Sequence, residues 1–184
     1  SNYDWVVHLG AIADMTCTDV DAVLHQNLEF SQWLFNECNK HGTHLQYASS
    51  SSVYGNTRDF SETAACYPQT PYAWSKYMFE RYMENHPISV WQAFRYFNVY
   101  GPEGEEHKGD QASPYYKFEK QAKETGVIKL FEGSENFCRD FIPAETVCKI
   151  HKHFLDVKDT GIWNVGTGRA TSFADVARMI ADKY

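Results

Sequence analysis

The sequence predicts an α/β fold: a partial, doubly wound parallel sheet with helices on its faces, joined to a small α/β lobe. Three segments rich in apolar, β-branched or aromatic residues, at 5–9, 45–49 and 89–97, are expected to be strands. Segments with helical periodicity separate them, and strands that alternate with helices form a parallel sheet. The 184 residues suffice for one substantial core but are too few for two domains of ordinary size.

The first half of the chain shows clear beginnings and ends for its elements. The run Trp5–Leu9 is mostly apolar, as in a parallel strand buried on both faces. Apolar residues at helical spacing from Val20 to Cys38 predict a helix that ends near Gly42. Pro71 stands where proline begins a helix, and that helix is expected to end before Pro87.

The second half is expected to begin irregularly and then return to regular structure. Polar and glycine-rich residues from Asn98 to Gln111 predict a long functional loop. Ser172 and Asp175 resemble a capping box in which aspartate replaces glutamate, which predicts a helix to the end of the chain. Further helices are expected at Pro114–Glu124 and Ala144–Leu155, and short strands at 128–131, 140–142 and 163–166.

Composition and charge exclude several classes of protein. Hydrophobic residues make up 43% and charged residues 22% of the chain, the balance of a soluble globular protein. No apolar run is long enough to span a bilayer, and the first residues lack the pattern of a signal peptide. The net charge of −7 argues against a nucleic-acid-binding face. We therefore expect a cytoplasmic protein with no nucleic-acid partner and no membrane partner.

Cysteines and histidines give no metal pattern. The five cysteines are scattered and form no C-x-x-C pair, which favours reduced thiols over a disulfide framework or a zinc site. Histidines lie close together at His41 and His44 and again at His151 and His153, without cysteine or carboxylate partners at ligand spacing. No bound metal is expected.

A tyrosine and a lysine four residues apart form the main catalytic candidate. Tyr72 and Lys76 lie on one face of the expected helix, within reach of a shared ligand. A nearby ammonium lowers the pKa of a phenol, and a serine from the run Ser49–Ser52 could hold a substrate oxygen beside it. Such a group moves a proton on or off a hydroxyl while hydride passes to or from a nicotinamide. The spacing alone also suits a solvated helix face; the flanking strands and serines favour the catalytic interpretation.

Three segments give the chain a family resemblance. Ala48-Ser-Ser-Ser-Ser-Val-Tyr-Gly55, Pro71-Tyr-Ala-Trp-Ser-Lys76 and Arg95-Tyr-Phe-Asn-Val-Tyr-Gly-Pro102 resemble the extended short-chain dehydrogenase/reductases that act on nucleotide sugars. Within that family the chain is most similar to the ADP-L-glycero-D-manno-heptose 6-epimerases. The segments that carry this finer likeness are Glu106–Gly109, Leu130–Phe141 and Gly161–Arg169. The resemblance implies a Rossmann-like sheet and a small substrate-binding lobe.

The resemblance also implies roles for individual residues. Ser50 would hold the substrate hydroxyl, Tyr72 would be a catalytic acid/base, and Lys108 a second base on the opposite face of the sugar carbon. The implied cofactor-binding residues are Leu9, Gly10, Ala11, Ile12, Ala13, Asn27, Lys76 and Val99. The implied substrate-binding residues are Asn98, Asp110, Lys117, Phe131, Glu132, Gly133, Ser134 and Arg139.

The residues of the second half also allow ordinary structural interpretations. Lys108 follows two glutamates and a histidine and could be a solvated loop charge. Arg139 suits a diphosphate because of its planar fork, but it could instead pair locally with Asp140. Phe131 could stack on an adenine or could belong to the core.

The expected reaction is the epimerisation of a nucleotide-activated sugar by transient oxidation and reduction with bound NADP, with NAD as the other possible cofactor. The resemblance implies conversion of ADP-D-glycero-D-manno-heptose to ADP-L-glycero-D-manno-heptose for lipopolysaccharide biosynthesis, by a homo-oligomer. A UDP-sugar 4-epimerase is the alternative isomerase, and a non-catalytic nucleotide-sugar-binding or regulatory relative is the alternative of another class. A dehydratase is disfavoured because Ser51 and Ser52 stand where that reaction needs an acidic pair.

One expected motif is absent from the sequence. Dinucleotide-binding sheets usually begin with a strand, a G-x-G-x-x-G loop and a helix, whose N–H groups meet the pyrophosphate. Gly101 and Gly104 lie in another context, after the third strand. We therefore expect a fragment of a longer protein that is inactive by itself. Residues 1–99 and 139–166 would be the remainder of the NAD(P)-binding domain, and 100–138 and 167–184 the substrate-binding lobe.

Overall fold

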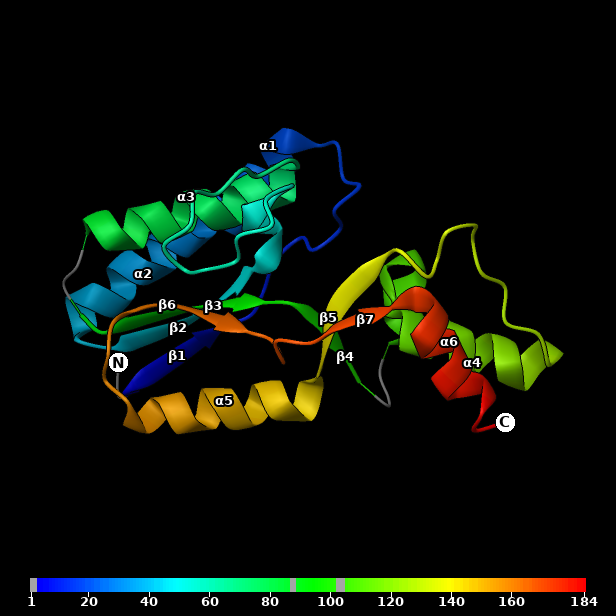
Figure 1. The fold of residues 1–184 in the computed structure, drawn as a ribbon. Coiled ribbons are helices and arrows are strands. Elements are labelled where there is room, and N and C mark those ends of the chain that lie inside the picture. The colour runs from blue at the N-terminus through cyan, green and yellow to red at the C-terminus, as the bar shows by residue number, and fades with distance from the viewer. Residues whose placement is uncertain (1–2, 87–88, 102–104) are drawn as a thin grey trace. The chain divides into compact units, whose positions relative to one another are not determined.

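The computed structural model describes residues 3–86, 89–101 and 105–184, which form two compact units (Figure 1). The first unit contains Ser1–Tyr96 and His151–Val165, and the second contains Phe97–Ile150 and Gly166–Tyr184. Each unit has its own sheet and its own apolar core.

The first unit is built on a four-stranded parallel sheet in the order β1-β2-β3-β6. The strands are β1 (Trp5–His8), β2 (His44–Ser50), β3 (Trp91–Tyr96) and β6 (Gly161–Val165). One face carries α1 (Val20–Val23), the π-helical turn η1 (Leu24–Glu29), α2 (Phe30–His41) and α3 (Pro71–Asn85). The predicted α/β fold with a parallel sheet is thus confirmed.

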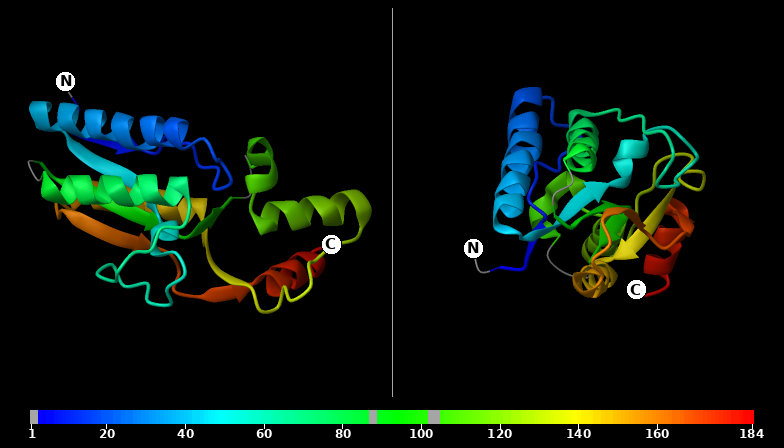
Figure 2. Two further views of the ribbon diagram at one scale, coloured as in Figure 1. Left: turned by 90° about the horizontal axis from the view of Figure 1, so that it is seen from above. Right: turned by 90° about the vertical axis from the view of Figure 1, so that its left-hand side faces the viewer.

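Helices α2 and α3 lie side by side on that face (Figure 2). Asn36 of α2 donates a hydrogen bond to the Tyr82 hydroxyl of α3 at 2.9 Å. Beneath them, the rings of Tyr47 on β2 and Phe79 on α3 meet edge to face, with centroids 4.6 Å apart. Both side chains are fully buried, so the helix that carries the candidate residues is anchored to the sheet by its apolar face.

The other face of the sheet is covered by the end of α5 (Ala144–Asp156), where Phe154 packs edge to face on Phe94 with centroids 5.0 Å apart. A short 3₁₀ helix, η2 (Ser51–Tyr54), follows β2 and ends at Gly55. Gly55 has a φ of 64°, and a Cβ there would stand 1.9 Å from the Tyr67 carbonyl oxygen. Only glycine therefore fits where the chain leaves the strand.

The second unit contains a small mixed sheet in the order β4-β5-β7. Strand β4 (Asn98–Tyr100) is parallel to β5 (Cys138–Pro143), which is antiparallel to β7 (Ala170–Ser172). Two helices, α4 (Pro114–Thr125) and α6 (Phe173–Ala181), pack on it around Phe118, Phe141 and Val176. The remaining helical segment is the 3₁₀ helix η3 (Glu106–Gln111).

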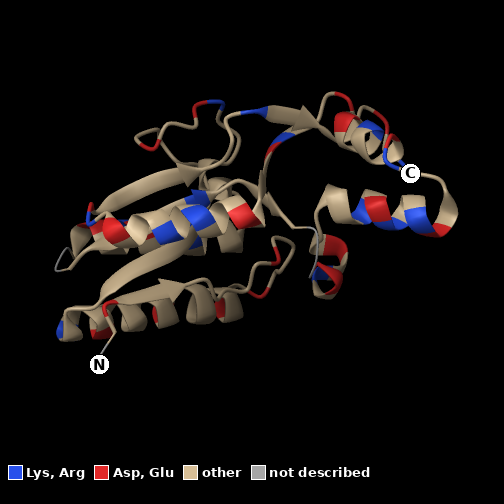
Figure 3. Ribbon diagram, turned by 90° about the horizontal axis from the view of Figure 1, so that it is seen from below, with Lys and Arg blue, Asp and Glu red and all other residues tan. Residues whose placement is uncertain are grey.

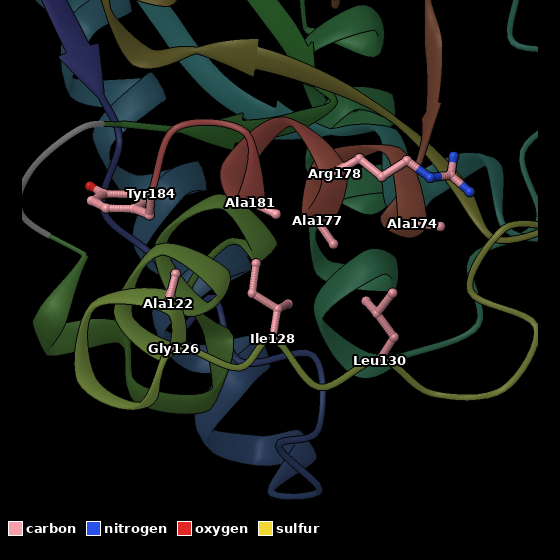
Figure 4. A pocket seen from close by; sticks show the side chains of 9 residues that line it. All are labelled: Ala122, Gly126, Ile128, Leu130, Ala174, Ala177, Arg178, Ala181 and Tyr184. Carbon is pink, nitrogen blue, oxygen red and sulfur yellow. The ribbon is translucent and has the colours of Figure 1, made fainter.

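The outer face of helix α4 lies in solvent because it carries charged side chains. Basic and acidic residues alternate along it (Figure 3), and Lys123 lies 3.5 Å from Glu119 one turn away. Its inner face meets α6 across an open groove of about 440 Å³ (Figure 4). The groove is lined by Ala122, Gly126, Ile128, Leu130, Ala174, Ala177, Arg178, Ala181 and Tyr184.

Most of the predicted helix boundaries are confirmed to within a few residues. Gly42 ends α2 with a left-handed φ of 67°. Pro71 begins α3, and the Thr70 hydroxyl caps it by accepting from Ala73 N. The Ser172 hydroxyl caps α6 by accepting from Asp175 N at 3.0 Å, as the capping-box pattern predicts. Helix α6 ends at Ala181 rather than at the last residue.

One predicted strand is shorter than expected, and two predictions about a loop and a strand were wrong. The strand predicted at 89–97 covers only Trp91–Tyr96, and the next residues form β4 in the other sheet. The predicted loop from Asn98 to Gln111 contains β4 and η3. Residues 128–131, all of them described, form no strand, because Lys129 N bonds the side-chain oxygen of Gln121 instead of a strand neighbour, at 2.8 Å.

Candidate active site

Ser50 and Tyr72 come from different elements of the first unit. Ser50 is the last residue of β2, and its hydroxyl accepts from Ser52 N at 3.2 Å, which starts the turn η2. Tyr72 is the second residue of α3. Burial raises the pKa of the Tyr72 phenol above its usual value, and a hydrogen bond with the Ser50 side chain opposes that rise. The strand end and the helix start thus place hydroxyl and phenol together.

Lys76 lies one turn after Tyr72 and is 2% exposed. Its Nζ donates to the Ala48 carbonyl oxygen at 2.7 Å and lies over the rings of Tyr47 and Tyr72, 4.6 and 5.6 Å from their centroids. Burial lowers the pKa of Lys76 to about 7, although Glu80 acts in the opposite direction.

One electrostatic prediction differs from this arrangement. The sequence predicts that Lys76 lowers the pKa of Tyr72, whereas the pKa of Tyr72 is raised. The reason is geometric: the ammonium group lies over the tyrosine ring and donates to Ala48 O. Burial therefore dominates the ionisation of both groups in this state.

Asn27 joins the segment after β1 to helix α3. Its side-chain oxygen accepts from Ile12 N at 2.8 Å, and its amide donates to Ile12 O at 3.0 Å and to the Ser75 hydroxyl at 3.1 Å. Ser75 in turn donates to Tyr72 O at 2.7 Å. Of the predicted cofactor segment, Leu9, Gly10, Ala11 and Ala13 are exposed and Ile12 is half-buried. The buried Asn27 thus positions an accessible segment relative to helix α3.

The sequence analysis missed His8, the last residue of β1. Its Nε2 lies 2.8 Å from the Ser31 hydroxyl, which donates to Asn27 O at 2.6 Å. Burial, with a smaller contribution from the charge of Lys76, lowers the pKa of His8 to about 4. A histidine at the end of a strand, two residues before Gly10, was the available signal.

A buried ion pair below the site was also missed. Arg95 of β3 donates to both carboxylate oxygens of Glu80 on α3, at 3.0 and 2.7 Å. Ser49 donates to the same carboxylate at 2.5 Å, and the Arg95 guanidinium lies 4.8 Å from the Tyr54 ring centroid. Glu80 follows Lys76 by four residues, the spacing that could have revealed it. The pair fixes α3 to the strands that carry Ser49 and Arg95.

Lys108 belongs to the second unit, in η3. Its Nζ lies 3.6 Å from a carboxylate oxygen of Glu105, and its side chain is 38% exposed. Glu105 is buried and accepts from Gly101 N at 3.0 Å, Ser113 N at 2.6 Å and Ser113 Oγ at 2.9 Å. Burial raises the pKa of Glu105, but these hydrogen bonds and Lys108 outweigh it, and the net shift is downward. Lys108 is thus a partly exposed cation beside a fixed carboxylate.

Four other candidates lie nearby in the second unit. Asn98 and Val99 are half-buried on β4, opposite Phe141 and Ile142 of β5. The Lys117 ammonium donates to Asp110 O at 2.6 Å, which ties α4 to the end of η3. These contacts are made within the protein and do not test ligand binding, so the ligand roles of these residues stay predictions.

The segment 131–139 forms a turn followed by β5. Phe131 is 50% exposed and packs edge-on against Phe173, with centroids 5.6 Å apart. Ser134 is buried and its N–H bonds Phe131 O at 3.2 Å; Glu132 is exposed, and Gly133 adopts a φ of 80°. Arg139 is exposed and donates to Cys138 O at 2.8 Å.

Asp140 does not pair with Arg139, because successive strand residues point to opposite faces. Its carboxylate instead accepts from Thr167 N at 2.8 Å, Thr167 Oγ1 at 2.6 Å and Gly168 N at 2.7 Å. The structure describes both Arg139 and Asp140, and it shows no ion pair between them, although the sequence allowed one.

Metal and membrane features were searched over the described residues. All five cysteine thiols are free. Within 3–86, 89–101 and 105–184, no three His, Cys, Asp or Glu side chains gather as a metal would need. No helix in the same ranges is both long and apolar enough to cross a bilayer. None of the predicted site residues lines the groove between α4 and α6.

Comparison with known proteins places these features in context. Residues 1–166 match the model of the NAD dependent epimerase/dehydratase family. Two proteins called ADP-L-glycero-D-manno-heptose-6-epimerase, from Brachyspira hyodysenteriae and Thiobacillus denitrificans, are each 40% identical, over 97% and 94% of this chain. The alignments cover 58% and 54% of those proteins, so the chain spans little more than half their length.

Solved structures agree in fold. The Helicobacter pylori ADP-L-glycero-D-manno-heptose-6-epimerase superposes with a TM-score of 0.92 at 29% identity, over 97% of this chain and 58% of that one. A UDP-N-acetylglucosamine 4-epimerase from Methanobrevibacter ruminantium, in complex with UDP-N-acetylmuramic acid, gives 0.89 at 27% identity, over 97% and 60%.

Proposed function

The chain belongs to the NAD dependent epimerase/dehydratase family, and on that premise we propose that its residues serve the epimerisation of a nucleotide-activated sugar by transient oxidation and reduction. The observation that carries the proposal is the meeting of Ser50, Tyr72 and Lys76 at the end of β2 and the start of α3. The proposed reaction converts ADP-D-glycero-D-manno-heptose to ADP-L-glycero-D-manno-heptose. The two relatives at 40% identity and the segments 106–109 and 130–141 support that substrate.

The residues present fit a nicotinamide dinucleotide. The Lys76 ammonium has three N–H donors and spends one on Ala48 O, which leaves donors for ribose hydroxyls. The exposed segment Leu9–Ala13, held by Asn27, offers backbone close to that lysine's helix. A bound NADP would supply the acceptor and donor of hydride. NAD would supply the same chemistry, and we propose NADP on the resemblance to the heptose epimerases.

The proton transfers fall to this chain's own side chains. Ser50 would hold the hydroxyl of the carbon being inverted, and Tyr72 would take the hydroxyl proton in the oxidation step; Lys108 would supply the proton in the reduction step. The raised pKa of Tyr72 means that the phenol is protonated in this state, so phenolate formation needs added positive charge beside it. Lys108 would act as a second acid/base on the other face of the carbon.

Two other functions remain as alternatives. A UDP-sugar 4-epimerase would use the same Ser50, Tyr72 and Lys76, and the similarity to the Methanobrevibacter ruminantium 4-epimerase favours it over other family reactions. A non-catalytic relative would bind nucleotide sugars without turnover. The buried lysine beside a phenol counts against that reading, because burying an ammonium costs stability and binding alone does not require it.

An exchange chimera tests the proposal. The matched region of the Brachyspira hyodysenteriae relative is replaced by this chain, and the purified protein is incubated separately with ADP-D-glycero-D-manno-heptose and UDP-galactose. NMR should show the heptose epimer, and Tyr72→Phe should slow its formation about a hundred- to ten-thousand-fold. Turnover of UDP-galactose alone would favour the 4-epimerase. A folded chimera that turns over neither sugar would favour the non-catalytic relative.

A further inference from the structure

His151 of α5 is a half-buried histidine that no step of the proposed reaction uses. Its Nδ1 lies 2.7 Å from Gln46 Oε1 on β2, and its Nε2 forms a hydrogen bond with the Tyr96 hydroxyl at the end of β3. Its ring also packs edge to face on Phe94, with centroids 4.8 Å apart. One side chain of the helix thus bonds to two neighbouring strands of the sheet.

Two buried glutamines decide which ring nitrogen of the histidine carries the proton. Gln92 points its amide nitrogen at the Phe154 and Val157 carbonyl oxygens, at 3.1 and 2.5 Å, and a carbonyl only accepts. Its own oxygen therefore faces Gln46, whose amide nitrogen donates to it at 3.0 Å. The Gln46 oxygen is left for His151 Nδ1, so Nδ1 is the protonated nitrogen.

This arrangement requires a neutral imidazole. With its proton on Nδ1, the ring of His151 has an acceptor at Nε2, and the Tyr96 hydroxyl donates to it. A second proton, on Nε2, would meet a hydroxyl that is already donating and would remove that hydrogen bond. Burial lowers the pKa of His151 below its usual value, so the ring is neutral at pH 7.

The bonds and ring contacts of the described residues place no charged side chain against the imidazole. From the sheet it meets an amide and two aromatic side chains, those of Gln46, Phe94 and Tyr96. On its own helix Lys152 and His153 are exposed, and no ion pair within the described part of the chain includes His151. A protonated His151 would be a half-buried charge without a counter-charge, a state that costs free energy.

Both strands that His151 bonds end at the candidate site. Strand β2 ends at Ser50, and Tyr96 is the partner of Ser50 in the register of β2 and β3. On the other face of the sheet, Lys76 of α3 donates to Ala48 O near the same strand end. His151 therefore fixes from α5 the strand ends that α3 fixes from the opposite face.

We propose that neutral His151, with its proton on Nδ1, is a positioning residue that holds the end of β3 beside β2 and so keeps Ser50 in place for the substrate hydroxyl. The role at Ser50 rests on the proposed function, whereas the protonation state of His151 does not. Protonation of His151 removes the bond to Tyr96, so the site is also sensitive to acid. His151 touches no substrate and acts only through the strands.

NMR of the 184-residue chain with isotope-labelled histidine tests the state of the ring. The shifts of the ring nitrogens distinguish the two neutral tautomers, and His151→Gln identifies the signal by its loss. We expect the Nδ1–H tautomer at neutral pH, and protonation at a lower pH than in the same chain unfolded in urea. The Nε2–H tautomer, or protonation at the same pH as in the unfolded chain, would overturn the inference.

Turnover by the exchange chimera across the acid range tests the positioning role. His151→Gln keeps a donor for Gln46 and an acceptor for Tyr96 but does not titrate, so it should retain turnover and shift the acid decline of kcat to lower pH. His151→Leu removes both bonds and should lower kcat about tenfold to a hundredfold, with little change in KM, because it displaces a reacting group. His153→Leu, at an exposed position of the same helix, is the matched control and should change neither.

Tyr96→Phe serves if His151→Leu does not fold, because it removes one hydroxyl and keeps the ring; it should lower kcat in the same way. Equal kcat in the unaltered, His151→Leu and Tyr96→Phe chimeras would overturn the positioning role and leave the epimerase proposal intact. An acid decline that is identical in His151→Gln would overturn the acid sensitivity. An unaltered chimera without turnover would overturn the proposed function and the role at Ser50 with it, while the NMR result still decides the state of His151.

Discussion

Burial sets the charge of the titratable groups around the candidate site. It lowers the pKa of His8 to about 4 and that of Lys76 to about 7, and it raises that of Tyr72. The spacing of Tyr72 and Lys76 predicted that they would share a helix face, and it could not predict these shifts. Desolvation depends on neighbours such as Tyr47, which comes from a strand far away in the sequence.

Lys108 allows a direct test of the two-base scheme. In the exchange chimera, Lys108→Met should abolish epimerisation, with a loss of about a hundred- to ten-thousand-fold, because it removes one acid/base group and keeps the aliphatic stem. The fold should survive, since the side chain is 38% exposed. Turnover by NMR and thermal unfolding are the measurements. Near-native turnover would make Lys108 an ordinary loop lysine and favour a single base with a rotating keto intermediate.

The lowered pKa of His8 predicts that the folded protein loses stability in acid. Its pKa is about 4 when folded and about 6.5 when unfolded, so between these values the unfolded chain binds more protons and stability falls as the pH falls. His8→Gln retains a donor for Ser31 but does not titrate, and it should remove up to roughly 3 kcal/mol of that loss. Urea unfolding at pH 7 and pH 4.5 measures it. His25→Gln, at an exposed position, is the control; equal pH dependence in wild type and His8→Gln would contradict the prediction.

Helix α3 holds the first unit together because successive residues on its buried face contact two different strands. Lys76 meets the end of β2, and Glu80, one turn later, meets Arg95 of β3. Its boundaries were predictable, since proline and a capping threonine act locally. The strands β4 and β7 were not, because they are three residues each and exist only through pairing with β5.

The buried ion pair gives a prediction for this helix. Glu80→Gln leaves the Arg95 guanidinium buried without its counter-charge and should destabilise the fold by about 3–5 kcal/mol. Glu84→Gln is the matched change on the same helix, where Glu84 pairs at 2.7 Å with Arg81 in solvent, and it should cost at most about 1 kcal/mol. Denaturant unfolding of both variants compares them. Similar losses would show that the pair does not anchor α3.

At the scale of the whole chain, the sequence predicts the parallel sheet more firmly than it predicts which ligands the chain binds. Alternating strands and helices predicted the parallel sheet, which is confirmed, since such alternation leaves few other topologies. The mixed sheet of the second unit was not predicted, because its strands pair over long separations in sequence. The roles assigned to the candidate residues come from the resemblance and stay predictions.

The cofactor provides the test at this scale. The sequence contains no G-x-G-x-x-G loop between a strand and a helix, so we expect this chain to lack the cradle of N–H groups that such a loop offers a pyrophosphate. Leu9–Ala13, Asn27 and Lys76 would contact only other parts of NADP. We therefore expect the 184-residue chain to bind NADP at least about a hundredfold more weakly than the exchange chimera. Calorimetric titration of both proteins measures this, with circular dichroism to establish that both are folded. Equal affinity would mean that the residues present suffice for the cofactor and that the glycine-rich loop is dispensable.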